Sequence, residues 1–227
     1  MKTTGKGKTG RPISFDRDAA LEAAMLLFWE RGFEGTSIAD LTAAMGLNPS
    51  SIYAAFGDKH ALFSLVVKRY LETRAQYATE ALQEPTLEKV IRALFDNTVA
   101  FLTTPGHPPT CMTLAGAMGC SVDAAPAREL MTEIRRQNEG AIRERLLEAR
   151  KTRELSKEVN VDDYTRYLSL LLAGLSIQAA NGSTKAELKR IAQLALRHLG
   201  YWDLCPPLDG LENRVNRIRK STFSNDR

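Results

Sequence analysis

The chain has 227 residues, of which 44% are hydrophobic and 26% are charged, and its formal net charge is +4. This length is sufficient for one or two domains with a buried core, and the composition excludes collagen-like, disulfide-rich and intrinsically disordered proteins. The 3 cysteines are too widely spaced for a disulfide framework and predict a reduced, cytoplasmic protein. No segment offers the ~20 mostly apolar residues of a membrane helix, so no membrane partner is expected.

Residues 1–13 form a predicted basic arm. They contain Lys2, Lys6, Lys8 and Arg11 and no acid, whereas acidic side chains outnumber basic ones over the following 60 or so residues. A short basic arm on such a domain suits contact with phosphate or with the minor groove of DNA. The alternative is a solvated tail whose lysines have no partner.

Helical periodicity predicts an all-α fold. In the N-terminal part, helices are expected at about 16–31, 37–45, 49–56 and 58–83. Ser37-x-x-Asp40 resembles a capping box at the start of the second helix, and Pro49 takes the favoured first position of the third. Residues 14–74 are the predicted N-terminal domain.

The rest of the chain is interpreted as a second helical domain over residues 75–200. Helices are expected at about 86–103, 111–121, 125–152, 162–181 and 184–199, with a proline-rich loop at 103–110. Residues 201–227 are expected to form a basic, weakly ordered tail.

The most informative stretch is a pair of short helices joined by a glycine turn at Gly46, a helix-turn-helix at about 37–56. Ile52 and Phe56 are four residues apart and must both face the core. A helical hairpin without a DNA role is the alternative. If the unit binds DNA, the second helix enters the major groove and presents its outward residues, which are Asn48, Pro49, Ser50, Ser51, Tyr53 and Ala54.

Residues 11–75 resemble the N-terminal DNA-binding domain of TetR-family transcriptional regulators. The resemblance rests on Gly32-Phe33, Thr36-Ser37-Ile38, Gly46, Ile52-Tyr53 and Phe56-x-x-Lys59-x-x-Leu62, all at the family's spacing. The length and helical character of the remaining chain are also similar to the family.

The resemblance implies a role for each matching residue. Thr36 and Ser37 would contact phosphate at the start of the second helix, as would Tyr53 and Lys59. Ser50 and Ser51 would reach base edges. The Ala54-Ala55 pair departs from many relatives, which carry polar or aromatic residues there. Direct base readout should therefore be sparse, and DNA shape together with minor-groove contact by Arg11 should supply more of the specificity.

The resemblance also implies a homodimer joined by the last two long helices, with a ligand cavity among the middle helices. The predicted interface consists of Leu168, Leu171, Leu172, Leu175, Ile191, Ala195 and Leu199. The candidate lining residues, which could equally be ordinary core, are Phe95, Phe101, Met112, Leu114, Met118 and Tyr164.

No catalytic, metal or cofactor site is expected. The three histidines are isolated, and Cys111 and Cys120 lie nine residues apart with no matching ligand pattern, so inert thiols are preferred over redox sensing. The sequence therefore predicts a repressor that binds a near-palindromic operator and is released by a small-molecule effector. The alternatives are a constitutive DNA-binding protein, or a helical metabolite-binding enzyme with a structural helix-turn-helix.

Overall fold

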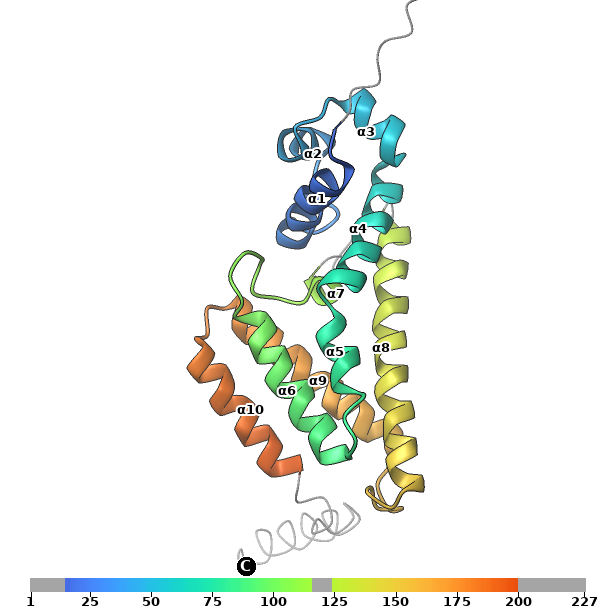
Figure 1. Cartoon of the computed structure of the whole chain (residues 1–227), viewed down its shortest axis with the longest axis vertical. Coiled ribbons are helices and arrows are strands. Elements are labelled where there is room, and N and C mark those ends of the chain that lie inside the picture. Colours follow the sequence, from blue (N-terminus) through green and yellow to red (C-terminus); the bar gives the residue numbers. More distant parts are fainter. Residues whose placement is uncertain (1–14, 116–123, 200–227) are drawn as a thin grey trace, which may run out of the picture.

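The computed structural model describes residues 15–115 and 124–199, which are all helical apart from turns and loops (Figure 1). This confirms the all-α prediction. The first four helices are α1 (Arg17–Arg31), α2 (Ile38–Met45), α3 (Pro49–Phe56) and α4 (Lys59–Thr73). They are followed by α5 (Gln76–Ala81), α6 (Leu87–Leu102), α7 (Met112–Ala115), α8 (Ala125–Lys151), α9 (Val161–Ala180) and α10 (Lys185–Leu199).

Helix α1 is the central element of the N-terminal part. It begins at Asp16, whose carboxylate accepts hydrogen bonds from the backbone N–H groups of Asp18 and Ala19 at 2.9 and 3.0 Å. Its apolar stripe is fully buried, and Phe28 meets Phe63 of α4 edge-on with a centroid separation of 5.1 Å. Packing against α4 therefore fixes α1, in addition to its own capping.

The expected helix at 58–83 is wrong as a single element. Helix α4 ends at Thr73, and α5 begins at Gln76. At the break Arg74 has φ −120°, and the backbone N–H groups of Arg74 and Ala75 both donate to the carbonyl of Tyr70. No proline or glycine marks this position. At the break, Arg74 pairs at 2.5 Å with Glu22 in α1, a contact that the local sequence does not specify.

The expected helix at 111–121 is only partly described. Helix α7 covers Met112–Ala115. Residues 116–123, with Met118 and Cys120, lie outside the described residues, as do 1–14 and 200–227 with the predicted arm and tail.

The core has two main clusters. One combines α1 to α4 with Met112 and with Met131 and Ile134 of α8, and the other combines α6, α8, α9 and α10. In Figure 1, α8 runs the length of the C-terminal part and reaches α4. The N-terminal helices are thus packed directly against an element of the C-terminal part.

An aromatic stack adds a second link between the two parts, and we call it the aromatic ladder. Tyr77 packs on Phe101 with nearly parallel rings at a centroid separation of 4.5 Å. Phe101, His107 and Trp29 contact one another, with centroid separations of 4.7 Å (Phe101–His107), 4.6 Å (His107–Trp29) and 5.7 Å (Trp29–Phe101). Tyr70 meets Trp29 edge-on at 5.0 Å. The ladder connects α5, α6 and the loop before α7 with α1.

Candidate nucleic-acid interface

Helix α2 begins with a complete capping box. The Ser37 hydroxyl accepts the Asp40 backbone N–H at 3.0 Å, and the Asp40 carboxylate accepts the Ser37 backbone N–H at 2.9 Å. Hydrogen bonds from the Ser37 side chain and backbone hold the pKa of Asp40 below its usual value. Arg31 at the end of α1 adds an ion pair to Asp40 at 3.1 Å. The entry to α2 is therefore rigidly defined.

The turn between α2 and α3 depends on Gly46. This residue has φ 64°, the left-handed conformation that favours glycine, and its N–H donates to the carbonyl of Thr42. Because the turn is this short, α3 follows at a fixed angle to α2, as a helix-turn-helix requires.

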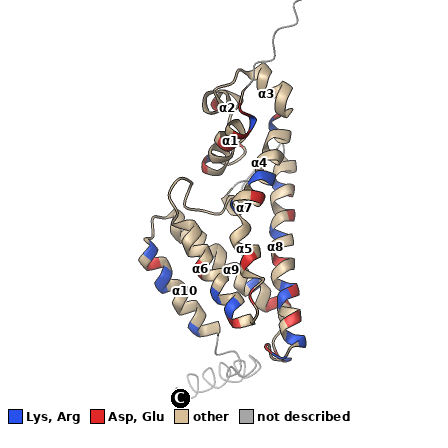
Figure 2. Cartoon of the chain, in the orientation of Figure 1, with Lys and Arg blue, Asp and Glu red and all other residues tan. Residues whose placement is uncertain are grey.

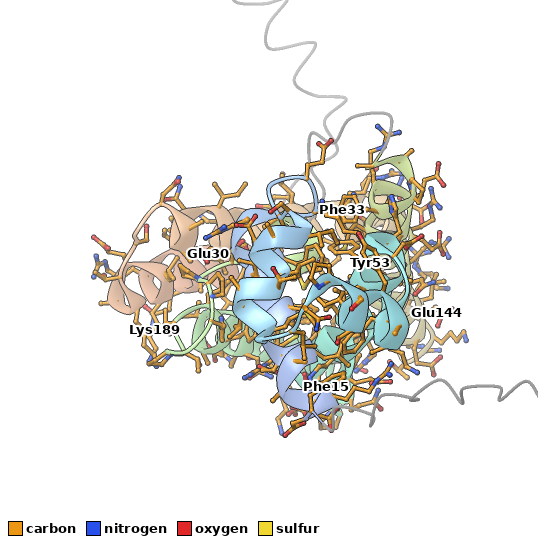
Figure 3. The ribbon with its side chains drawn as sticks, turned by 90° about the horizontal axis from the view of Figure 1, so that it is seen from above. Phe15, Glu30, Phe33, Tyr53, Glu144 and Lys189 are labelled. Carbon is orange, nitrogen blue, oxygen red and sulfur yellow. The ribbon has the colours of Figure 1, made fainter. Side chains whose placement is uncertain are left out.

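Helix α3 has a buried face and an open face. Ile52 and Phe56 are 1% and 3% exposed, as expected from their spacing. Tyr53 is 49% exposed, and Asn48, Pro49, Ser50 and Ala54 also lie at the surface. Figure 3 looks onto this end of the molecule, with Tyr53 labelled. These residues, which the sequence pattern predicts to face outward, thus form one accessible surface.

The start of α3 is held by Asn48. Its side-chain oxygen accepts the backbone N–H of Ser51 at 2.8 Å and the hydroxyl of Ser50 at 2.7 Å. The Ser50 hydroxyl therefore already has a partner within the cap, whereas Ser51 is half-buried beside it. Of the two serines, Ser50 must exchange this bond before it can donate to a base.

Helix α3 carries no charged side chain (Figure 2). Cations flank it instead. Lys59 at the start of α4 lies 4.3 Å from the ring centroid of Phe33, and Arg17 of α1 donates to the carbonyl of Ala55 at 3.0 Å while lying over Phe56. Sequence reasoning missed Arg17. Its position just before the apolar stripe of α1 was the available signal, but only the fold brings it to the end of α3.

Thr36 does not occupy the expected phosphate-contacting position. Its exposed fraction is 0%, and its hydroxyl donates to the carbonyl of Gly32 at 2.8 Å. Its hydrogen bond therefore stabilises the connection between α1 and α2. Of Thr36 and Ser37, only Ser37 is exposed. Arg11 lies outside the described residues.

Comparisons with known proteins agree with this geometry. Residues 20–66 match the model for bacterial regulatory proteins of the tetR family. The chain is 30% identical over 194 residues to the HTH-type transcriptional repressor ComR of Escherichia coli K12, covering 85% of this chain and 92% of ComR. The chain belongs to the TetR family. It is therefore a helix-turn-helix DNA-binding transcriptional regulator.

Two further relatives support the assignment along most of the regulator. The repressor BdcR of E. coli K12 is 30% identical, over 82% of this chain and 90% of BdcR. The structure of a cysteine mutant of the TetR-family regulator CifR, complexed with 26-bp operator DNA, superposes with a TM-score of 0.79. That match has 32% identity and covers 82% of this chain and 98% of CifR.

The C-terminal part of the regulator contains a cavity of about 420 Å³ among α5, α6, α8 and α9. Met118 lies outside the described residues, and of the other five candidate lining residues only Leu114 borders the cavity. Phe95 and Met112 are buried in the core, Phe101 belongs to the aromatic ladder, and Tyr164 borders a second hollow beside α10. Large apolar side chains are the ones most often used as core, which explains why these assignments were wrong.

The predicted dimer interface is also partly wrong. Leu168, Leu175 and Leu199 are 1%, 1% and 7% exposed, because they pack against neighbouring helices of the same protomer. Leu171, Leu172 and Ala195 are half-buried. The large apolar side chains that α9 and α10 leave exposed are Leu170, Ile177, Ile191 and Leu194, of which only Ile191 was predicted.

Within residues 15–115 and 124–199, no three His, Cys, Asp or Glu side chains gather into a group that could hold a metal ion. Over the same residues, no helix is long and apolar enough to cross a membrane.

Proposed function

We propose that this regulator is a homodimeric repressor that covers promoter DNA and is released by a small molecule bound in its C-terminal part. The observation that carries the proposal is the open face of α3, with Tyr53 at its centre and the capped turn fixing its angle. The relatives ComR and BdcR are named transcriptional repressors, which supports repression over activation.

In the proposed complex, α3 lies in the major groove. Tyr53 and Lys59 contact phosphates on either side, and the free backbone N–H groups at the starts of α2 and α3 add further phosphate contacts. The residues nearest the bases and the adjacent sugar–phosphate backbone are Ser37, Pro49, Ser50, Ser51 and Ala54. The methyl group of Ala54 suits contact with a thymine methyl.

Arg17 is added to this set because it lies beside the last turn of α3, where a phosphate of the same groove would pass. We further propose that Arg11 reaches the minor groove from the basic arm. Residues 14–74 act as the DNA-binding domain and residues 75–200 as the effector and dimer domain.

The proposed dimer uses the exposed apolar side chains of α9 and α10, namely Leu170, Ile177, Ile191 and Leu194. Burial of these side chains against a second copy, as in a four-helix bundle, removes apolar surface from water and so stabilises the dimer. Two-fold symmetry then places the two α3 helices about 34 Å apart, or a multiple of it, so the operator is a near-palindrome.

Release requires that the effector favour a different spacing of the two α3 helices, with a coupling free energy of roughly 1–3 kcal/mol. The cavity bordered by α5, α6, α8 and α9 supplies the place for the effector. The function needs no catalysis, and its site of action is the cytoplasm, where bacterial DNA lies.

Selection of bound sequences from randomised duplex DNA tests the proposal. We expect a near-palindromic consensus bound by two protomers. Recovery of no consensus, or of a single asymmetric half-site, would contradict it. If the selected operator is bound but no compound in a metabolite screen changes operator affinity, the constitutive alternative is preferred.

A further inference from the structure

The cavity in the C-terminal part of the regulator has a wall that is mostly apolar. It has a volume of about 420 Å³, within the range of sites that bury most of a small ligand. Its apolar wall is contributed by several helices, through Leu82, Leu94, Leu102, Ile142, Leu172 and Ala173. A molecule with a hydrocarbon body would therefore gain free energy from leaving water here.

One charged side chain in this wall is half-buried. Arg135 of α8 donates from Nη1 to the carbonyl of Thr113 at 2.6 Å and from Nη2 to the hydroxyl of Thr132 at 2.9 Å. A guanidinium has five N–H donors, so three are left for another acceptor. No carboxylate in the described part of the chain forms an ion pair with Arg135, although the cavity's other arginine, Arg166, pairs with Asp163 at 3.4 Å.

The other charged side chains of the described lining do not offset Arg135. Glu139 and Arg166 both lie exposed, and Arg166 is already paired with Asp163, so Arg135 is the half-buried charge of the wall. Ser169 contributes a hydroxyl whose oxygen is buried without a hydrogen-bond partner among the described residues. An incoming oxyanion would therefore find a cation with spare donors in partly dry surroundings.

We propose that the cavity binds a monoanionic amphiphile, whose carboxylate is held by Arg135 while its hydrocarbon body lies along the leucines. This rests on the proposed function in taking the cavity as the effector site. A carboxylate suits the guanidinium because it can accept two parallel N–H bonds, which an alcohol or an ammonium ion cannot do.

The same arginine connects the cavity with the DNA-binding helices. Thr113, whose carbonyl accepts from Arg135, has its hydroxyl 3.0 Å from the sulfur of Cys111. That sulfur lies 3.5 Å from the hydroxyl of Tyr70 in α4, which is fully buried. A carboxylate that draws the guanidinium away from Thr113 changes the first of these contacts between Arg135 and Tyr70. Because α4 follows directly after α3, such a change can reach the DNA-binding helix.

Binding of straight-chain probes to the full-length protein tests the proposal. Octanoate, decanoate and dodecanoate are compared by calorimetry with decan-1-ol and decylammonium, each below its micelle concentration. We expect the best carboxylate to bind at least tenfold more tightly than decan-1-ol, and decylammonium to bind more weakly than both. Equal binding of carboxylate and alcohol, preference for the ammonium ion, or no binding of any probe would each overturn the proposal.

Two variants locate the site. Arg135→Gln should reduce decanoate affinity at least tenfold and leave decan-1-ol unchanged, because it removes the charge and keeps a donor for Thr113. The matched control is Arg136→Gln on the same helix, which removes an arginine paired with Glu133 outside the cavity and should leave both affinities unchanged. Ala173→Phe should fill the cavity and reduce binding of both probes. Circular dichroism checks that each variant is folded.

Operator binding is measured in parallel without any probe. A protein that binds its operator but shows no carboxylate preference retains the proposed function and loses this inference. A protein that binds decanoate through Arg135 but no DNA retains the ligand site and loses the repressor function. If decanoate binds the parent protein through Arg135 but does not lower its affinity for the operator, the cavity binds the anion without coupling it to DNA, and the link through Thr113 is overturned.

Discussion

The indole N–H of Trp29 in α1 donates to the backbone carbonyl of Thr110 at 3.0 Å. Thr110 precedes Cys111, which borders the cavity, and the backbone N–H of Cys111 donates to the hydroxyl of Ser176 in α9 at 2.8 Å. One short segment therefore touches both the DNA-binding helices and the ligand-binding helices. This makes Trp29 the residue of α1 best placed to respond to a change around the cavity.

Trp29→Phe should weaken the link between the two parts. The variant keeps a ring for the aromatic ladder but leaves the Thr110 carbonyl without its donor, which costs about 1–3 kcal/mol. We expect a lower free energy of unfolding in urea and a smaller effect of any bound effector on operator affinity. An unchanged effector response in a folded variant would show that the coupling does not pass through this bond.

Tyr53→Phe should weaken DNA binding without changing sequence preference. It removes a hydroxyl that we expect to bond a phosphate, at a cost of about 1 kcal/mol on operator and non-operator DNA alike. Fluorescence anisotropy at constant salt measures both. Tyr167→Phe on α9 removes the same group far from α3 and should have no effect. If Tyr53→Phe binds as tightly as the parent, Tyr53 makes no phosphate bond.

Removal of residues 1–10 should reduce the salt dependence of operator binding. The deleted segment contains Lys2, Lys6 and Lys8, and the slope of log affinity against log salt should fall by roughly 0.9 for each phosphate that these lysines neutralise. Titrations at several salt concentrations give the slope. A deletion that lowers affinity while leaving the slope unchanged would contradict the assignment of these lysines to phosphates.

Ile177→Glu or Leu194→Glu should separate the dimer into folded monomers. Both side chains are more than half exposed in one protomer, so the substitutions should not disturb its core, but a carboxylate buried against a partner costs several kcal/mol. Sedimentation reports the assembly. Gln178→Glu and Gln193→Glu add the same charge at neighbouring exposed positions and should remain dimeric. A dimer that survives both apolar substitutions must use another surface.

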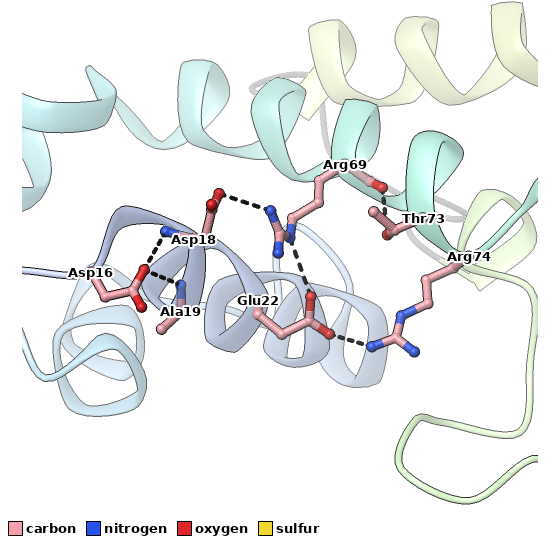
Figure 4. Close-up of polar contacts among 7 residues, drawn as sticks. All are labelled: Asp16, Asp18, Ala19, Glu22, Arg69, Thr73 and Arg74. Atoms are coloured by element: carbon pink, nitrogen blue, oxygen red, sulfur yellow. Dashed lines mark hydrogen bonds and ion pairs between the residues drawn. The ribbon is translucent and has the colours of Figure 1, made fainter.

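The ion pairs between α1 and the end of α4 should make stability depend on pH. Glu22 accepts from Arg69 at 3.2 Å and from Arg74 at 2.5 Å, and Arg69 also pairs with Asp18 at 3.0 Å (Figure 4). Burial opposes ionisation of Glu22, but the hydrogen bonds from Arg74 and Arg69 outweigh it and lower its pKa. Because the pKa of Glu22 is lower in the folded state than in the unfolded state, its ionised form stabilises the fold at pH values above the ordinary carboxyl pKa. This stabilisation is lost as the pH falls through the folded-state pKa.

Glu22→Gln should therefore lower the free energy of unfolding at pH 7 by about 1–2 kcal/mol, reduced by the partial exposure of the site. The difference from the parent should shrink at acid pH, as the parent's Glu22 takes up its proton. Urea unfolding at a series of pH values measures both effects. A difference that stays constant down to pH 3 would mean that the charge of Glu22 is not the stabilising feature.

Local sequence determined the DNA-binding helices well. The helix caps and the turn depend on residues that lie close together in the sequence, so they could be predicted without knowing the fold. They are Ser37 with Asp40, Asn48 with Pro49, and Gly46. The spacing of Ile52 and Phe56 likewise set the face of α3. The residues predicted to face outward on α3 are accordingly exposed, apart from Ser51, which is half-buried.

The tertiary structure decided what depends on contacts distant in sequence. Helix periodicity shows that Leu168 and Leu175 share a stripe, but only packing shows that the protomer's own helices cover it and leave Ile177 and Leu194 exposed. At the break after α4, Arg74 likewise bonds to Glu22, 52 residues earlier in the chain. Burial of Thr36 and the placing of Arg135 in the cavity wall depend on neighbours that no local pattern specifies, because side-chain burial is set by which elements meet.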